Sequence, residues 1–152
     1  MKVEYINPFL KSTVDVFKQT TGMELERGEI SLKSDAVPSL DLSGVISLTG
    51  LVSGLVVMSV EERVALKVAE AMLQEPFEKV DKDVIDLIGE LTNMVAGKAK
   101  AGLAQFKMTL GLPTVVTGKN HEVCFPADVQ PISIPFSIAD GRVIVDVGLS
   151  EK

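Results

Sequence analysis

Residues 83–105 read DVIDLIGELTNMVAGKAKAGLAQ, a run without proline that predicts one long amphipathic helix. A helix turns by about 100° per residue, which places four of its apolar residues on one side: Val84, Ile88, Leu91 and Val95. An aspartate just before this run, Asp81 or Asp83, is expected to cap the helix. The rest of the chain is expected to pack against the apolar side.

The opposite side of this helix has an unusual composition. It carries the following residues: Asp86, Gly89, Glu90, Asn93, Ala96, Gly97 and Lys100. Glu90 and Asn93 are three residues apart, so their side chains project together. Each helical glycine costs about 0.5–1 kcal/mol relative to alanine, so two of them on a solvated face need a reason. A face with few long side chains, one carboxylate and one carboxamide predicts a surface on which a partner docks.

The residues before this helix predict a helix, three strands and a second helix. Asn7 and Pro8 have the pattern of a cap and first helical residue, and Gly22 is expected to end that helix. Strands are expected at Met23–Leu32, Leu40–Leu48 and Gly54–Ser59, the last two forming a hairpin. Ser59 and Glu62 have the spacing of a capping box that opens the second helix.

The residues after it predict strands only. They are expected at Thr114–Thr117, His121–Phe125, Val129–Ile138 and Arg142–Leu149, the last two joined through a turn at Asp140-Gly141. Pro131 and Pro135 favour an edge or interrupted strand. Because strands come in runs, the prediction is a single α+β domain over residues 1–152, with a mostly antiparallel sheet and two long helices packed on one face.

Composition narrows the function. The 152 residues carry a net charge of −6, which argues against a nucleic-acid or anionic-membrane partner. The start, MKVEYINPFL, lacks the features of a signal peptide, and the apolar run Val45–Val60 is too short and polar to span a membrane. One cysteine, Cys124, fits a reducing cytoplasm, and with only one histidine no metal site is expected.

Spacing alone does not assign a function to Glu90 and Asn93. Most exposed Glu and Asn residues are simply solvated, and the same spacing recurs at Glu4 and Asn7. With Pro8 next to Asn7, that second pair is expected to straddle a helix start and to form no site. His121 and Cys124 are expected on opposite sides of a strand, which argues against a catalytic Cys–His pair.

The string Asp86-Leu-Ile-Gly-Glu90-Leu-Thr-Asn93-Met-Val-Ala-Gly97-Lys98 resembles the signature of the CheC/CheX/FliY family, which dephosphorylates the chemotaxis regulator CheY. The family pattern is Asp or Ser, Glu four residues on, and Asn three further. Leu112-Pro-Thr-Val-Val-Thr-Gly118 and the order of elements are also similar, most of all to the CheX branch.

The resemblance implies a phosphatase for a phosphorylated CheY-type response regulator. It implies Glu90 and Asn93 as catalytic residues, Asn93 positioning the attacking water and Glu90 docking on the regulator's lysine. Asp86, Gly89 and Gly97 would contact the partner, the glycines by letting its backbone come close. The chain would need no cofactor of its own, because Mg²⁺ is expected in the regulator.

A homodimer is also implied, paired through the C-terminal strands or the second helix. Two other functions stay open at this point. The chain could be a module that binds the regulator without hydrolysis, or a structural subunit whose helix face is buried in an oligomer.

Overall fold

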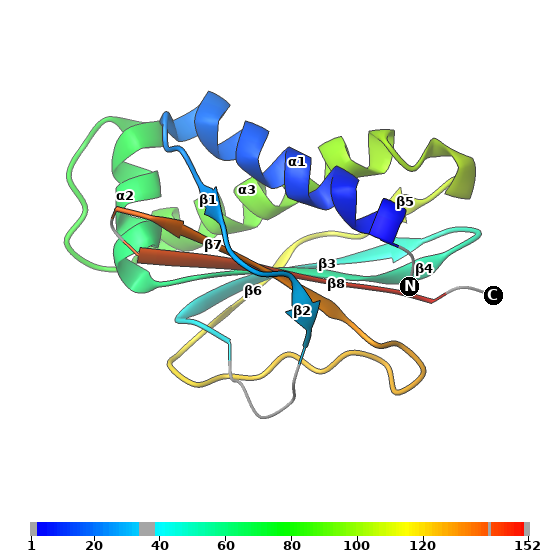
Figure 1. Ribbon diagram of the computed structural model, residues 1–152. Helices are drawn as coiled ribbons and strands as arrows, with labels where there is room; N and C mark the ends of the chain where they lie inside the picture. The colour runs from blue at the N-terminus through cyan, green and yellow to red at the C-terminus, as the bar shows by residue number, and fades with distance from the viewer. Residues whose placement is uncertain (1–2, 34–38, 140, 151–152) are drawn as a thin grey trace.

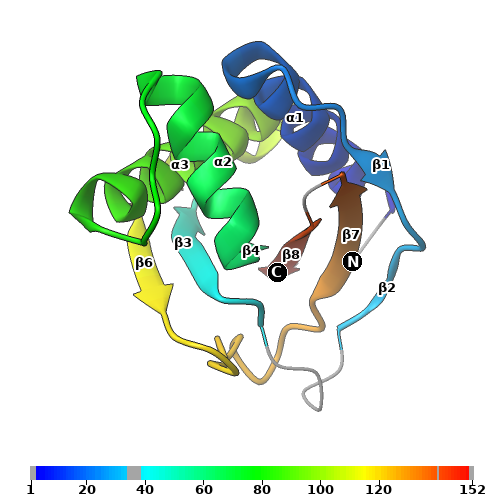
Figure 2. The same cartoon turned by 90° about the vertical axis from the view of Figure 1, so that its left-hand side faces the viewer.

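Three helices cover one face of an eight-stranded antiparallel sheet in the described part of the chain (Figure 1; Figure 2). The computed structural model describes residues 3–33, 39–139 and 141–150. The helices are α1 (Val3–Thr21), α2 (Glu62–Leu73) and α3 (Lys82–Ala101). The predicted α+β class, with two long helices on one face, is confirmed, and α2 is a shorter third helix on that face.

The sheet has the order β1-β7-β8-β4-β3-β5, with β2 paired to β7 and β6 paired to β3. Its long strands are β3 (Leu42–Thr49), β4 (Ser53–Val60), β7 (Ile132–Ile138) and β8 (Gly141–Ser150). Its short strands are β1 (Glu26–Arg27), β2 (Ser31–Leu32), β5 (Thr109–Leu110) and β6 (Thr114–Thr117). The two expected hairpins are present, β3 with β4 and β7 with β8. Asp140, expected in the second turn, lies outside the described residues.

The core lies between the helices and the sheet. The four apolar residues expected to face inward from α3 are fully buried there: Val84, Ile88, Leu91 and Val95. Alternate residues of the central strand β8, such as Val143, Val145 and Val147, are buried in the same cluster, as the strand period of two requires. The core therefore fixes which side of α3 stays outside.

The start of α1 differs from the prediction. The helix already includes Val3, so Pro8 lies inside it and Asn7 is no cap. Proline is tolerated here because it lies within the first two turns and removes a single intrahelical bond, the one to the carbonyl of Glu4. Glu4 and Asn7 therefore both stand on a helix, and both are exposed. Gly22 ends α1 as expected, with a φ of 74°.

The predicted capping box of α2 is also wrong. Ser59 lies in β4, where its hydroxyl accepts a hydrogen bond from the backbone N–H of Leu40 (2.7 Å). The cap comes instead from Asp41, directly before β3, whose carboxylate accepts a hydrogen bond from the backbone N–H of Glu62 (2.8 Å). A residue distant in sequence therefore satisfies the first turn of this helix.

Two predicted strands are shorter or missing. Met23–Leu32 contains only the two-residue strands β1 and β2, which both pair with β7. The outer side of β7 is therefore only partly paired, in keeping with the two prolines expected near a sheet edge. His121–Phe125 forms no strand, and its backbone crosses the sheet face opposite the helices.

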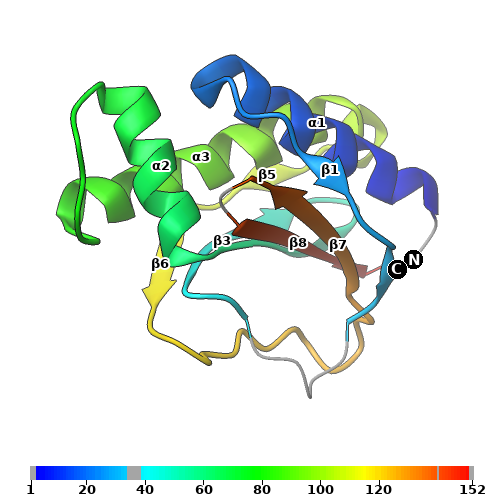
Figure 3. The same ribbon diagram turned by 60° about the vertical axis from the view of Figure 1, so that its left-hand side comes forward.

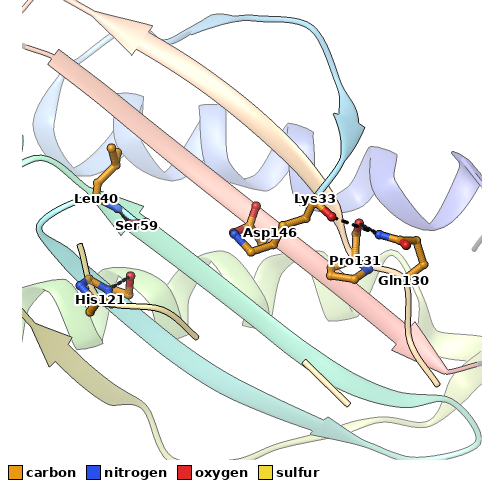
Figure 4. A network of polar contacts seen from close by, with 8 residues as sticks. Lys33, Leu40, Ser59, His121, Gln130, Pro131 and Asp146 are labelled. Carbon is orange, nitrogen blue, oxygen red and sulfur yellow. Dashed lines mark hydrogen bonds and ion pairs between the residues drawn. The ribbon is translucent and has the colours of Figure 1, made fainter. Parts of the chain in front are cut away.

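Side-chain bonds hold this crossing segment and its neighbours to the sheet (Figure 4). The ring of His121 lies 2.6 Å from the hydroxyl of buried Ser43 on β3. Lys33, next to β2, makes a 3.0 Å ion pair with Asp146 of β8, whose side chain is 2% exposed. The sheet is thus covered on both faces, and the second face combines these polar contacts with apolar ones, such as Phe125 and Val129 against Gly148.

Candidate functional site

The candidate site lies on the outer side of α3. The carboxylate of Asp81 caps the helix by accepting the backbone N–H of Val84 (3.0 Å). The helix ends at Ala101, four residues before the predicted end. Its last turn tightens at Gly102, where an added Cβ would lie 3.2 Å from Pro8 of α1, and Ala104–Phe106 follows as a short 3-10 helix.

Four of the predicted site residues form one stripe along α3. At about 100° per residue, Asp86, Glu90, Asn93 and Gly97 fall within an arc of about 60°. Asp86 and Glu90 are exposed, and Asn93 and Gly97 are half-buried. Among the described residues, no hydrogen bond or ion pair engages Glu90 or Asn93. Both side chains are therefore available to an incoming partner.

Asp86 already has a partner. Its carboxylate accepts a hydrogen bond from the ammonium group of Lys82 (3.1 Å), one turn back on the exposed surface. This hydrogen bond and the attraction between the two charges raise the pKa of Lys82. Asp86 also lines a shallow groove of about 390 Å³, together with Leu73, Glu75, Asp83 and Leu87. This end of the stripe is acidic and open.

The expectation that Gly89 and Ala96 are uncovered is wrong. Both are buried, and an added Cβ at Gly89 would lie 3.3 Å from Val115 and 3.8 Å from Pro113. Gly89 therefore makes room for the chain's own β6 rather than for a partner. Gly97 is different, because an added Cβ there would meet only Leu110, at 3.8 Å.

The connector between β5 and β6 forms one border of the stripe. It includes Leu112, whose side chain is 92% exposed and which is not among the site residues predicted from the sequence. The other border is formed by Leu87 and Met94, which are half-buried against the core. Nothing in the sequence pattern separates an exposed leucine in this connector from a buried one. The exposure of Leu112 follows only from the way β6 packs on α3 in the folded chain.

Glu4 and Asn7 both stand on α1, so the expectation that this pair straddles a helix start is wrong. Its Glu4 nevertheless differs from Glu90, because Glu4 already has an interaction within the protein, whereas no other described residue engages Glu90. His121 and Cys124 form no site either. The His121 ring is engaged by Ser43 and by the carbonyl of Gly118, and the Cys124 thiol is exposed.

Metal and membrane signals are absent from the described residues. No group of three or more His, Cys, Asp or Glu side chains among them is placed to hold a metal ion. None of the helices described combines the length and apolar composition that crossing a membrane requires.

Comparison with known proteins gives a consistent picture. The family model "Chemotaxis phosphatase CheX" matches residues 42–137, well over half of the chain. The curated protein "CheY-P phosphatase CheX" of Thermotoga maritima is 29% identical over 126 residues, which cover 81% of each chain. A CheC-like superfamily protein from Shewanella sp. PV-4 has 38% identity and a TM-score of 0.92, with 99% of both chains covered.

A chain of the CheX–CheY–BeF₃–Mg²⁺ complex from Borrelia burgdorferi is also similar. It has 25% identity and a TM-score of 0.85, and the match covers 99% of this chain and all of that one. The match to the family model includes α3 and its stripe, and the structural likeness extends over nearly the whole fold. The chain belongs to the CheX family of chemotaxis phosphatases.

Proposed function

We propose that this chain hydrolyses the aspartyl phosphate of a CheY-type response regulator, with Asn93 and Glu90 as the catalytic pair. The observation that carries the proposal is the pairing of these two side chains on the exposed stripe of α3, unengaged by other described residues. The names of the Thermotoga relative and of the Borrelia complex support this class of partner.

Asn93 positions the attacking water. An aspartyl phosphate is an acyl phosphate whose leaving carboxylate needs no general acid, so hydrolysis requires mainly an in-line water and charge neutralisation. A carboxamide can hold that water because it both donates and accepts hydrogen bonds. A carboxylate at the same place would repel the phosphoryl oxygens. Asn93 is half-buried on a rigid helix, which limits the rotamers of its side chain.

Glu90 sets the docking register. Its exposed carboxylate lies one turn before Asn93 and is free to form a charge-assisted hydrogen bond with a lysine of the regulator. Asp86, one turn further back, adds negative charge at the edge of the contact, and Gly97 leaves room for the partner's backbone. The charge on the phosphoryl group is neutralised by Mg²⁺ and lysine in the regulator, so the phosphatase itself needs no metal.

The test is the lifetime of the phosphate on a receiver domain loaded with a small phosphodonor and Mg²⁺. The wild-type protein is expected to accelerate phosphate release from a CheY-type receiver of the same cell. Asn93→Ala and Asn93→Asp are each expected to lower this acceleration by about a hundredfold, the loss typical of a misplaced reacting group. Undiminished acceleration by Asn93→Ala would contradict the mechanism.

A non-catalytic binding module gives a different outcome in the same assay. It predicts binding that Glu90→Lys weakens, with no change in phosphate lifetime. A structural subunit predicts no binding and an α3 stripe that is protected in the oligomer. The homodimer and the cytoplasmic location stay predictions, to be tested by sedimentation and by fractionation of cells.

A further inference from the structure

An exposed leucine lies in the connector that borders the stripe. The exposed large apolar side chains of the described residues are Leu32 (66%), Leu51 (63%), Leu73 (42%) and Leu112 (92%). Single exposed leucines are common on protein surfaces, so exposure alone carries no argument. Leu112 is distinguished by its position in the fold and by the rigidity of its backbone.

The backbone on both sides of Leu112 is fixed to the sheet. Leu110 pairs with Leu48, and Thr114 pairs with Val45, so β3 holds both ends of the connector. Between them, the backbone N–H of Gly111 donates to the carbonyl of Ser47 (2.8 Å). Pro113 further restricts the chain because its ring fixes φ. Leu112 is thus presented to solvent on a backbone with little freedom.

This connector runs along α3 next to the stripe. Leu110 lies beside Gly97, and Pro113 lies beside Gly89, each 3.8 Å from the Cβ that the glycine lacks. Leu112 lies between these two contacts in sequence, in the part of the connector that runs past the segment from Gly89 to Gly97, which includes Asn93. Figure 3 shows β6 continuing from this connector beneath α3.

We propose that Leu112 is a docking residue that packs against the receiver domain when the aspartyl phosphate reaches Asn93. The proposal rests on the proposed function, and it names the receiver as occupant because Leu112 borders the stripe on which that partner docks. The stripe offers mainly polar and charged groups, and Leu112 adds an apolar contact beside them. A side chain on a pre-organised backbone loses little conformational entropy on binding, which is the property of an effective anchor.

The experiment measures binding of a CheY-type receiver activated with beryllofluoride and Mg²⁺, together with the kinetics of phosphate release. Leu112→Ser is expected to weaken binding about tenfold, equivalent to about 1.4 kcal/mol. It is expected to raise KM by a similar factor and to leave kcat unchanged, because Leu112 does not touch the reacting atoms. Its melting temperature should equal that of the wild type, since the side chain is exposed.

The matched control is Leu32→Ser, an exposed strand leucine on β2, near the edge of the sheet opposite β6. It is expected to leave receiver binding unchanged. Equal binding by Leu112→Ser and the wild type would overturn the inference. So would a loss of self-association in Leu112→Ser without a loss of receiver binding, because the occupant would then be a second copy of this chain.

Failure of the proposed function is distinguishable from failure of this inference. A wild-type protein that binds the activated receiver without accelerating hydrolysis would contradict the proposed catalysis, while weaker binding by Leu112→Ser would still support the docking role. A wild-type protein that binds no CheY-type receiver would overturn both. An active wild type with an unaffected Leu112→Ser variant would overturn the docking role alone.

Discussion

Thr92 of α3 lies directly over Gly44 of β3. A Cβ added to Gly44 would meet the Thr92 hydroxyl first and would also come within 2.8 Å of the Thr92 Cβ and 3.2 Å of its Cγ2. Thr92 is fully buried, and its hydroxyl donates to the carbonyl of Ile88 (2.7 Å), which satisfies it within the helix. The missing side chain on β3 therefore lets α3 pack closely on the sheet, and this contact sets the height and rotation of the stripe on the helix's other side.

Gly44→Ala is expected to lower the free energy of unfolding by about 1–3 kcal/mol, because the new methyl group overpacks the contact with Thr92. It should also reduce phosphatase activity, since α3 must shift outward to accept it. Urea unfolding and phosphate release measure the two effects. Gly44→Ala combined with Thr92→Ala, which removes both the hydroxyl and the methyl group of Thr92, should recover part of the stability, and a strictly additive double variant would contradict this account.

Gly97→Ala is expected to raise the free energy of unfolding by about 0.4–1 kcal/mol, because the site is helical and an added Cβ meets only Leu110 at an ordinary contact distance. If Gly97 leaves room for the partner, the same variant should bind the receiver more weakly. Gly89→Ala is the comparison. Its Cβ would press on Val115, so a smaller gain or a loss of stability is expected. Tighter receiver binding by Gly97→Ala would argue against its role in docking.

Asn7→Ala is expected to leave phosphate release unchanged, within the error of the assay, while Asn93→Ala lowers the acceleration by about a hundredfold. Asn7 is exposed on α1 three residues after Glu4, so geometry alone does not exclude a second site. The expectation rests on Glu4, which, unlike Glu90, already has an interaction within the protein. A twofold loss of kcat in Asn7→Ala, at unchanged stability, would instead indicate two active sites.

Asp41→Ala is expected to destabilise the protein by about 1 kcal/mol, because it removes the carboxylate that caps α2. Glu62→Ala should change stability by less than about 0.5 kcal/mol, as most surface substitutions do. A capping box at Ser59 and Glu62 would predict a clear loss in Glu62→Ala. Thermal and urea unfolding of the two variants decide between these accounts.

The sequence by itself determined the helix that carries the site and the side of it that faces outward. Only one rotation of the helix about its axis buries all four of its regularly spaced apolar residues, Val84, Ile88, Leu91 and Val95. That rotation places Glu90 and Asn93 on the outer side. The alternating residues and turn glycines of β3, β4, β7 and β8 likewise specified long strands. Local periodicity suffices in these segments because burial of one face dominates their free energy.

Only the tertiary structure decided which neighbours each residue has. Asp41 caps a helix 21 residues further along the chain, and β6 covers Gly89 on a face that looked open. The segment 121–125 is irregular, and the ring of His121 bonds to Ser43 of β3, 78 residues away in the sequence. These contacts join residues far apart in sequence, so no local pattern records them, and they exist only once the chain has packed.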